Sequence, residues 1–402
     1  MHLDNPHFEL NKLLHSKMNK IYFFQAIFTF IKSLIGIFVP VYLFSIGFSV
    51  YKIIFFVMGI SLMCLLVNPL GTKIISKIGF KYTILLSIPF YFIQLFALFQ
   101  VETIPIYFHL IWISYGIHMA LFWPAFHSEI VFSGSNQHRS SEVGTLHTLT
   151  ALFGAFAPFV GGFFLQYIGF NALLLFASIL LIIGLIPFFL SQDISISNSN
   201  VSYSKYIEFI KTARNNPKKK IEKRAFLSEG LESLLVLVLW PLILFYLFKN
   251  NFFKLGTLFT FVSILSVIFI IYYKSKIDLK GKDKFVRKLS KFLSFNWYLR
   301  FFGILISVFF IVILEIFFKL LNSIFLLSYI SIFYNNTKNQ NFMEYILFRD
   351  FFIHLAKISF GFLLIGIYFF VGFNYIYFYF VVLLGILAPV GQSFLKEEKL
   401  NI

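Results

Sequence analysis

Residues 191–225 read SQDISISNSNVSYSKYIEFIKTARNNPKKKIEKRA and form the longest polar stretch of the chain. Apolar runs dominate the sequence on both sides of it. Of the 402 residues, 59% are hydrophobic and 13% are charged, whereas soluble globular chains have about 45–50% apolar and about 25% charged residues. This composition excludes a water-soluble domain and indicates a membrane protein. We interpret 191–225 as a solvated linker between two apolar halves, with a short amphipathic helix around Tyr206 as the alternative for part of it.

The two halves contain twelve runs of about 20 mostly apolar residues, the length that a membrane-spanning helix needs. These runs cover about 20–46, 50–70, 82–101, 104–126, 141–165, 171–190, 226–248, 253–273, 295–316, 318–334, 349–371 and 373–394. The ninth and tenth runs are barely separated, so eleven spans is the alternative. The predicted domains are a cytoplasmic N-tail (1–19), a six-helix bundle (20–190), the linker (191–225), a second six-helix bundle (226–394) and a cytoplasmic C-tail (395–402).

The distribution of Lys and Arg predicts the orientation, because basic residues concentrate in cytoplasmic loops. With a cytoplasmic N-terminus, the inside segments carry 27 of the 34 basic residues. The outside loops carry four, namely Lys52, Lys249, Lys254 and Lys319. This split predicts two cytoplasmic termini and an even number of spans, which favours twelve. It also assigns the net charge of +17 to a membrane face rather than to nucleic-acid binding.

Two pairs of landmarks predict that the halves are repeats of each other. Val39-Pro40-Val41 lies in the first span and Trp240-Pro241-Leu242 in the seventh, with the prolines 201 residues apart. Gly79 and Gly281 follow the second and eighth spans and are 202 residues apart. Such internal symmetry is typical of secondary transporters.

Six plus six spans, a basic central loop and these glycine turns resemble the major facilitator superfamily. The first turn reads Ser76-Lys77-Ile78-Gly79-Phe80-Lys81 and the second Asp278-Leu279-Lys280-Gly281-Lys282. The resemblance implies an all-α membrane fold with two six-helix bundles, in which these turns are gating loops that hold the outward-open state. The gating residues would be Ser76, Lys77, Gly79, Lys81, Asp278, Gly281 and Lys282. Ser76 stands where the family has an acid, which weakens the first lock.

Two further motifs bear on the kind of transporter. Ala157-Pro158-Phe159-Val160-Gly161-Gly162 resembles the family's Gly-Pro-x-x-Gly-Gly signature of exporters, although Pro and paired Gly also serve helix packing. Proton antiporters of the family usually carry an Arg about one turn before a Gly in helix four. Trp112 occupies that place before Gly116, which argues against simple drug/proton antiport. His118 is a substitute titrating group.

Ionisable residues inside the spans are the predicted substrate-binding or coupling groups, because a charge at mid-membrane is costly and needs a cavity or a partner. Lys32 lies eight residues before Pro40 and Glu232 nine before Pro241. The resemblance places helices one and seven across a central cavity. We therefore hypothesise that Lys32 and Glu232 approach each other or share a substrate. A structural salt bridge and a snorkelling lysine are the alternatives.

Other polar groups complete the set of predicted residues. Asp350, His354 and Lys357 follow i, i+4, i+7 spacing, so they form one stripe on a helix. Lys357 and His354 are predicted site residues, whereas Arg349 and Asp350 also suit an interfacial cap. Glu229, one turn before Glu232, is a secondary prediction. His118 and His147 also suit neutral histidines bonded to a backbone carbonyl. His109, Arg300 and Glu315 are interpreted as structural, and His127, Glu129, Arg139 and Glu142 as a cytoplasmic charge cluster that contributes to gating.

The sequence therefore predicts a monomeric secondary active transporter that moves a small organic solute by alternating access, with ion coupling open. Two basic groups out of three favour an anionic or zwitterionic substrate, and the aromatic content equally suits an amphipathic one. The predicted location is the plasma membrane, the inner membrane of a bacterium. Cys64 stands alone, which excludes an intrachain disulfide, and no metal site or other cofactor is expected. A membrane-embedded lipid-modifying enzyme, with His127-Ser128-Glu129 as its nearest reactive group, and a non-transporting receptor on the same fold are the alternatives.

Overall fold

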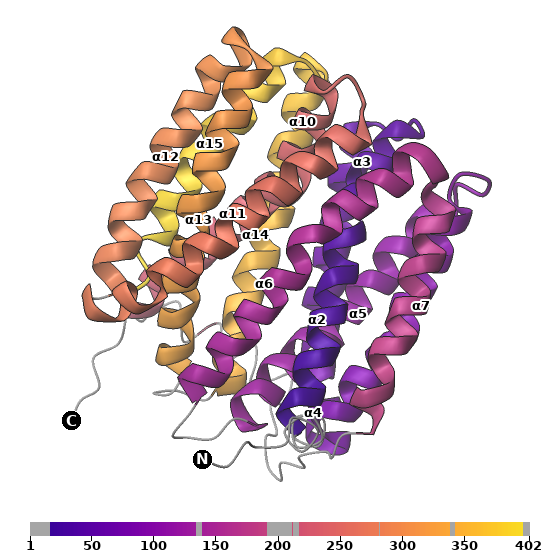
Figure 1. Ribbon diagram of the computed structural model, residues 1–402, viewed down its shortest axis with the longest axis vertical. Helices are drawn as coiled ribbons and strands as arrows, with labels where there is room; N and C mark the ends of the chain where they lie inside the picture. Colours follow the sequence, from indigo (N-terminus) through magenta and orange to yellow (C-terminus); the bar gives the residue numbers. More distant parts are fainter. Residues whose placement is uncertain are drawn as a thin grey trace, which may run out of the picture.

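The computed structural model describes residues 17–133, 139–190, 217–280, 282–337 and 342–396, together with residue 211. Every element in these residues is a helix. The first half contains α2 (Lys17–Ile35), α3 (Phe38–Ser45), α4 (Val50–Gln100), α5 (Tyr107–Ser133), α6 (Arg139–Phe163), the π-helix η1 (Phe164–Ile168) and α7 (Phe170–Phe189). The second half contains α9 (Pro217–Leu234), the π-helix η2 (Leu235–Leu239), α10 (Trp240–Leu247), α11 (Phe252–Lys280), α12 (Lys282–Ile306), α13 (Val308–Thr337), α14 (Phe342–Val371) and α15 (Tyr375–Gln392). The two halves stand side by side in Figure 1.

Nine helical segments within the described residues are long and apolar enough to cross a membrane. One of them is α4, whose 51 residues contain Gly79 at φ +83° and ψ 175°, a conformation that only glycine adopts readily. The chain reverses there, so α4 comprises two helices. Counting α4 twice and adding α5 and α12 gives twelve spans. That count goes beyond the nine apolar segments and stays a prediction.

At one end of the bundle α2 begins, α4 bends at Gly79 and α7 ends. We call it the basic end, because it carries Lys20, Lys73, Lys77 and Lys81. This is the lower end in Figure 1. The opposite end, at which α3 and α10 stop, is called the far end. The first spanning helix of this half, α2, starts at the basic end, and its last, α7, stops there. This is consistent with an even number of spans in the first half.

The predicted boundary between the ninth and tenth spans is wrong. The prediction placed it near residue 317, but α12 ends at Ile306 and α13 begins at Val308. The break falls at Ser307, whose hydroxyl accepts a hydrogen bond from the Phe310 amide at 3.2 Å and so caps α13. Lys319 consequently lies in the middle of α13 and not in an outside loop. The charged first turns of α12 hid this helix from a search for apolar runs.

The predicted start of the seventh span also differs from the structure. The apolar run begins at residue 226, whereas α9 begins at Pro217, a residue that suits the first position of a helix. The basic end of the linker is therefore helical. Its Lys219 pairs with Glu222 at 2.7 Å, one turn later on the same helix.

Both predicted proline landmarks follow a break in the α-helical hydrogen-bonding pattern of a spanning helix, which is a turn in the first half and a π-helix in the second. Pro40 is the third residue of α3, and residues 36–37 form a turn between α2 and α3. Pro241 is the second residue of α10, which follows the five-residue π-helix η2. Proline fits the first turn of a helix but removes a hydrogen bond further in, so each proline starts a new helix. The two halves thus break their first helix at matching positions.

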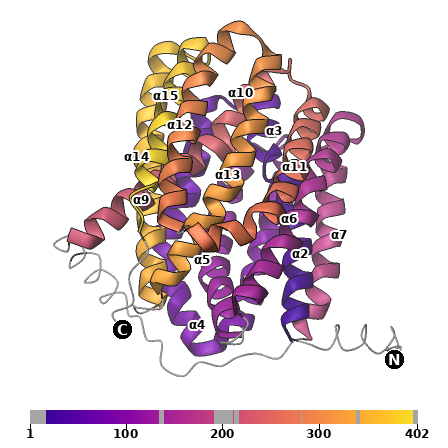
Figure 2. The same ribbon diagram turned by 60° about the vertical axis from the view of Figure 1, so that its left-hand side comes forward.

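Helices of the two halves pack directly on each other: α6 on α11, α4 on α14, and α3 on α10. Figure 2 shows α6 and α11 next to each other. An added Cβ on Gly256 of α11 would lie 2.3 Å from the carbonyl oxygen of Pro158, and one on Gly162 would lie 2.6 Å from that of Phe252. The Ala157–Gly162 motif therefore supports the packing interpretation, since its glycines let the two helices touch.

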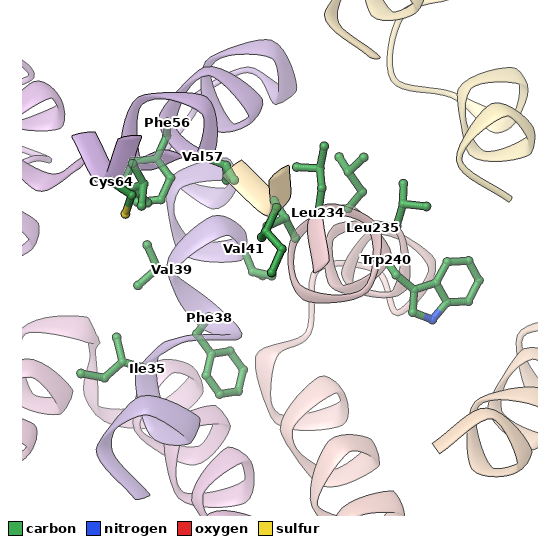
Figure 3. Close-up of a cluster of buried hydrophobic side chains, with 14 of the residues drawn as sticks. Ile35, Phe38, Val39, Val41, Phe56, Val57, Cys64, Leu234, Leu235 and Trp240 are labelled. Atoms are coloured by element: carbon green, nitrogen blue, oxygen red, sulfur yellow. The ribbon is translucent and has the colours of Figure 1, made fainter. Parts of the chain in front are cut away.

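Apolar side chains from both halves form one continuous core. Figure 3 shows part of it, with Phe38, Val39 and Val41 of the first half and Leu234, Leu235 and Trp240 of the second among the labelled side chains. The helices that follow the two breaks, α3 and α10, contact each other. This arrangement positions the polar groups described below.

Candidate functional site

Lys32 lies near the middle of the molecule, on the first-half helix α2. Its ammonium nitrogen stands over the ring of Trp123 on α5, 4.2 Å from the ring centroid. Such a cation–π contact holds an ammonium group without neutralising its charge. The half-buried Lys32 has no carboxylate within 4.0 Å among the described residues.

Lys357 and His354 approach the same region from the second half, on α14. Lys357 is half-buried and lies close enough to Lys32 for the two positive charges to repel each other. It also interacts electrostatically with Cys64 of α4, which places its ammonium group at the boundary between the halves. His354 is buried, and its Nδ1 has no hydrogen-bonding partner in the described part of the chain. The predicted stripe on this helix therefore includes a lysine at the boundary between the halves and a buried ring nitrogen without a partner among the described residues.

Glu229 belongs to a separate cluster within the second half. It accepts a hydrogen bond and a close ion pair from Arg349 of α14. It also accepts a hydrogen bond from the Tyr329 hydroxyl of α13 at 3.1 Å. Asp350 lies 3.7 Å from the Arg349 guanidinium. Arg349 therefore does more than cap a helix, since its bonds to Glu229 join α14 to α9 and, through Tyr329, to α13, while Asp350 lies beside it on α14.

Glu232 is also in the second half, and the described residues contain no ion pair between it and Lys32. The amide of Gln392 on α15 donates to its Oε2 at 2.5 Å, and the side chain is only 6% exposed. The Oε1 atoms of Glu232 and Gln392 have no partner among the described residues. The hypothesis that Lys32 and Glu232 share a substrate stays open, but their direct pairing is not formed in this structure.

His118 is buried inside the first half, one helical turn from Lys32 through its contact with Phe28. Its Nδ1 contacts the Ser87 carbonyl oxygen at 3.0 Å, and its ring packs between Phe28, Tyr91 and Phe122. A neutral histidine that donates to a backbone carbonyl fits this environment. The position favours the structural alternative for His118. The side chain of His147 lies outside the described residues.

The first predicted gating turn holds its own half together. Lys81 donates to the carbonyl oxygen of Phe189 at 2.6 Å, and Lys20 donates to that of Leu190 at 3.1 Å, so both lysines bind the C-terminus of α7. Ser76 donates to the Lys73 carbonyl of its own helix at 2.8 Å and Lys77 is exposed. The side chain of Asp278 and all of Gly281 lie outside the described residues, and Lys282 begins α12.

The halves also meet at the basic end through His127 of α5. Its Nδ1 lies 2.7 Å from the hydroxyl of Tyr334 on α13, and its ring stacks on Trp123 at 5.4 Å. A continuous chain of contacts therefore runs from Lys32 through Trp123 and His127 to Tyr334. Glu129 is buried in the same helix, and the side chains of Arg139 and Glu142 lie outside the described residues.

Aromatic side chains join the halves at the far end. Phe44 of α3 meets Phe373 at 5.4 Å between ring centroids, and Tyr51 of α4 meets Phe369 at 5.3 Å. Gln166 accepts a hydrogen bond from the Phe252 amide at the start of α11, at 3.1 Å. Contacts at both ends thus enclose the region of Lys32 and Lys357.

A buried ion pair in the second half lies outside the set of predicted binding residues. Arg300 and Glu315 pair at 2.7 Å, and the indole of Trp240 donates to the same carboxylate oxygen at 2.8 Å. Both charged side chains are almost fully buried, which agrees with their structural interpretation. Lys319, one turn after Glu315, stands 5.6 Å from the ring centroid of Phe259.

Sequence reasoning missed three groups near these charges. Lys319 was assigned to a loop because the tenth span was placed too late in the chain. The sequence gives no reason to single out Trp123, since aromatic residues make up 21% of it. Gln392 lies at the end of the last span, where a neutral amide attracts no notice. Only the intramembrane position of Lys319 could have been found, by testing a break at Ser307.

An apolar groove of about 540 Å³ between α4 and α7 contains none of these groups. It is lined by Leu85, Ile88, Pro89, Phe92, Ile182, Leu185, Ile186, Phe189 and Leu190. Several of these side chains are exposed on the outside of the first half. The groove therefore has no connection with the boundary between the halves.

Comparison with solved structures confirms the architecture. A D-xylose-proton symporter aligns with a TM-score of 0.68 at 12% identity, over 97% of this chain and 98% of that one. The nucleoside transporter NupG aligns with a TM-score of 0.64 at 13% identity, over 94% and 98%. A point mutant of NupG gives 0.65 at 15% identity, over 95% and 98%. The chain has a major facilitator superfamily fold. No protein-family model and no curated protein matches the sequence.

The fold places this chain among multi-pass membrane proteins, and the solved structures that it resembles are transporters. At these identities the likeness establishes the fold alone. The role of each side chain therefore rests on the geometry described above.

Proposed function

We propose that this protein is a secondary active transporter that moves a small organic solute across the plasma membrane by alternating access. The solute would bind between the halves, at Lys32 and Trp123 on one side and Lys357 and His354 on the other. The termini would face the cytoplasm, so that the basic end is the cytoplasmic end. The chain would act without a catalytic centre.

The observation that carries this proposal is a pair of ammonium groups, one from each half, that lie close enough to act on each other electrostatically and have no carboxylate within 4.0 Å in the described part of the chain. Lys32 has the Trp123 ring as its close partner, and Lys357 lies at the boundary near Cys64. Maintaining such charges inside apolar helices is costly, which is why they usually mark a substrate path. The matching breaks in the first helix of each half add support, since transporters place their sites where helices are interrupted.

An uptake assay with reconstituted protein tests the proposed function. Proteoliposomes would be incubated with an isotope-labelled extract of small metabolites, with and without a proton gradient, and their contents analysed by mass spectrometry. We expect at least one solute to enter vesicles that contain the protein and not protein-free vesicles. Lys357→Met should abolish this uptake, whereas Lys254→Met, an exposed lysine at the start of α11, should leave it unchanged. Uptake of no solute by the unaltered protein would contradict transport.

A further inference from the structure

The charges that the structure describes around the proposed site do not balance, and the imbalance indicates the substrate class. The charged neighbours of Lys357 within the described residues are Lys32, Arg349, Glu229 and Asp350, and the Cys64 thiol and the His354 ring also interact with it. With Lys357 itself, the charged groups comprise three cations and two carboxylates. Both carboxylates lie beside Arg349, so one positive charge at the boundary has no counter-charge among these groups.

Lys32 carries this uncompensated charge. Its ammonium group contacts the Trp123 ring at 4.2 Å, and the charge that acts on it most strongly within the described residues is the like charge of Lys357. A ring face attracts a cation but supplies no counter-ion. A small anion placed between the two ammonium groups would replace their mutual repulsion by attraction.

We infer that the substrate is a small organic monoanion, such as a carboxylate, bound by Lys32 from the first half and Lys357 from the second. This inference rests on the proposed function and names the substrate class of the same site. One negative charge balances the excess and turns a repulsion between the halves into a bridge. The Nδ1 of His354, unpartnered within the described residues, supplies a further hydrogen-bonding group, and Trp123 supplies an apolar surface for the body of the anion.

The bridge connects binding to movement of the halves. Trp123, which holds Lys32, also stacks on His127, and His127 contacts Tyr334 of the second half. An anion that draws Lys32 toward Lys357 therefore changes the position of the ring beneath Lys32. Through that ring it acts on the contact that joins the halves at the basic end.

A thermal-shift panel on the purified full chain tests the inference without any transport step. Each carboxylate, with benzoate and lactate as the first probes, is compared with its uncharged amide, benzamide or lactamide. We expect at least one carboxylate to raise the Tm in a saturable manner and its amide to have no effect. Lys32→Met and Lys357→Met should each weaken the apparent affinity at least tenfold, whereas Lys32→Arg should retain a response to the anion.

Lys52→Met is the matched control, because Lys52 also lies over an aromatic ring, at 5.7 Å from the Phe48 centroid, but is exposed at the far end. Its response to the carboxylate should stay within twofold of the unaltered protein. The empty Lys32→Met protein should have the same Tm as the unaltered protein or a higher one, since the substitution removes a repulsion. A weaker response to the carboxylate, together with an unchanged or higher Tm of the ligand-free variant, separates lost binding from damaged folding.

The inference is overturned if no carboxylate raises the Tm, if amides act as well as carboxylates, or if the Met variants keep the full response. Transport of a neutral or cationic solute in the uptake assay would refute the substrate class and leave the proposed function intact. Charge-dependent binding without uptake of any solute would contradict the proposed function and leave the inferred class of ligand intact.

Discussion

At the scale of single residues, the charged side chains inside the apolar helices differ in whether they have a counter-charge. The Arg300 guanidinium lies 4.1 Å from the ring centroid of Trp240 and 2.7 Å from Glu315, so it has a carboxylate as its counter-charge. Lys32 has a ring and, among the described residues, no carboxylate. A compensated pair maintains a fold, whereas an intramembrane charge without a counter-charge at the boundary between the halves is a candidate ligand-binding group. This contrast separates the Arg300–Glu315 pair from Lys32, which we assign to the site.

Breaking the compensated pair should destabilise the protein strongly. Glu315→Gln leaves Arg300 as a buried cation without a counter-ion, and we expect a loss of about 3–5 kcal/mol in the free energy of unfolding. Equilibrium denaturation in detergent micelles measures it. Glu102→Gln, an exposed carboxylate bonded to Tyr42, should cost no more than about 1 kcal/mol. Equal stabilities for these two variants would refute the structural role of Glu315, and Arg300→Met combined with Glu315→Met should recover most of the loss.

The sequence predicted which charges lie inside the membrane better than it predicted their partners. Lys32, Glu232 and Lys357 stand out because each interrupts an apolar run. Their partners depend on how each helix is rotated about its axis, and a 59% hydrophobic sequence provides little amphipathic pattern to fix that rotation. The hypothesised Lys32–Glu232 pair is not formed for this reason. Glu232 faces Gln392 within its own half instead.

At the scale of elements, the sequence located the turn at Gly79 and the two proline landmarks, although the prolines were predicted only as marks of a repeat. Gly79 acts through a local covalent constraint. The effect of a proline depends on its surroundings, since Pro124 and Pro158 lie inside helices that continue past them. The Ser307 break was missed because serine ends a helix only in context, and because charged turns open α12. The basic start of α9 was missed for a similar reason, since it is helical without being apolar.

Any side chain at Gly79 should destabilise the protein. At φ +83° and ψ 175°, a Cβ introduces backbone strain, and we expect Gly79→Ala to lower the free energy of unfolding by about 1–3 kcal/mol. Gly366→Ala is the control, because Gly366 is helical and an added Cβ there would meet no atom within 4 Å. That substitution should be neutral or stabilising, since Ala favours helices. Thermal unfolding of both variants measures the difference, and equal midpoints would show that the turn adapts without strain.

At the scale of the whole molecule, the two halves touch through helices that approach each other closely. Gly162 and Gly256 allow the contact of α6 with α11, and Phe159 donates its amide to Thr260 at 2.8 Å across the same boundary. The resemblance predicted the six-plus-six architecture, and the alignment with solved transporters over nearly the full chain confirms the fold. The short motif itself could not indicate that its glycines face the other half.

Widening this contact should impair transport more than it impairs folding of either half. Gly256→Ala places a Cβ 2.3 Å from the Pro158 carbonyl, so α6 and α11 must separate. We expect the uptake rate to fall at least tenfold, while helix content measured by circular dichroism stays unchanged. Gly366→Ala again serves as the control and should retain full uptake. Normal uptake by Gly256→Ala would show that the close approach is not required for the movement.

Movement of the halves about Lys32 and Lys357 is tested most directly by two distances measured at opposite ends of the same protein. Cys64→Ser removes the sole cysteine, and spin labels can then be placed at Lys73→Cys with Lys220→Cys for the basic end, or Ser45→Cys with Lys254→Cys for the far end. Pulsed electron paramagnetic resonance would measure the distance between the two spin labels of each pair, without ligand and with the carboxylate that stabilises the protein most. Alternating access predicts that one distance shortens as the other lengthens, and that Lys32→Met abolishes both changes. Distances that change in the same direction, or that change equally in the Lys32→Met variant, would contradict it.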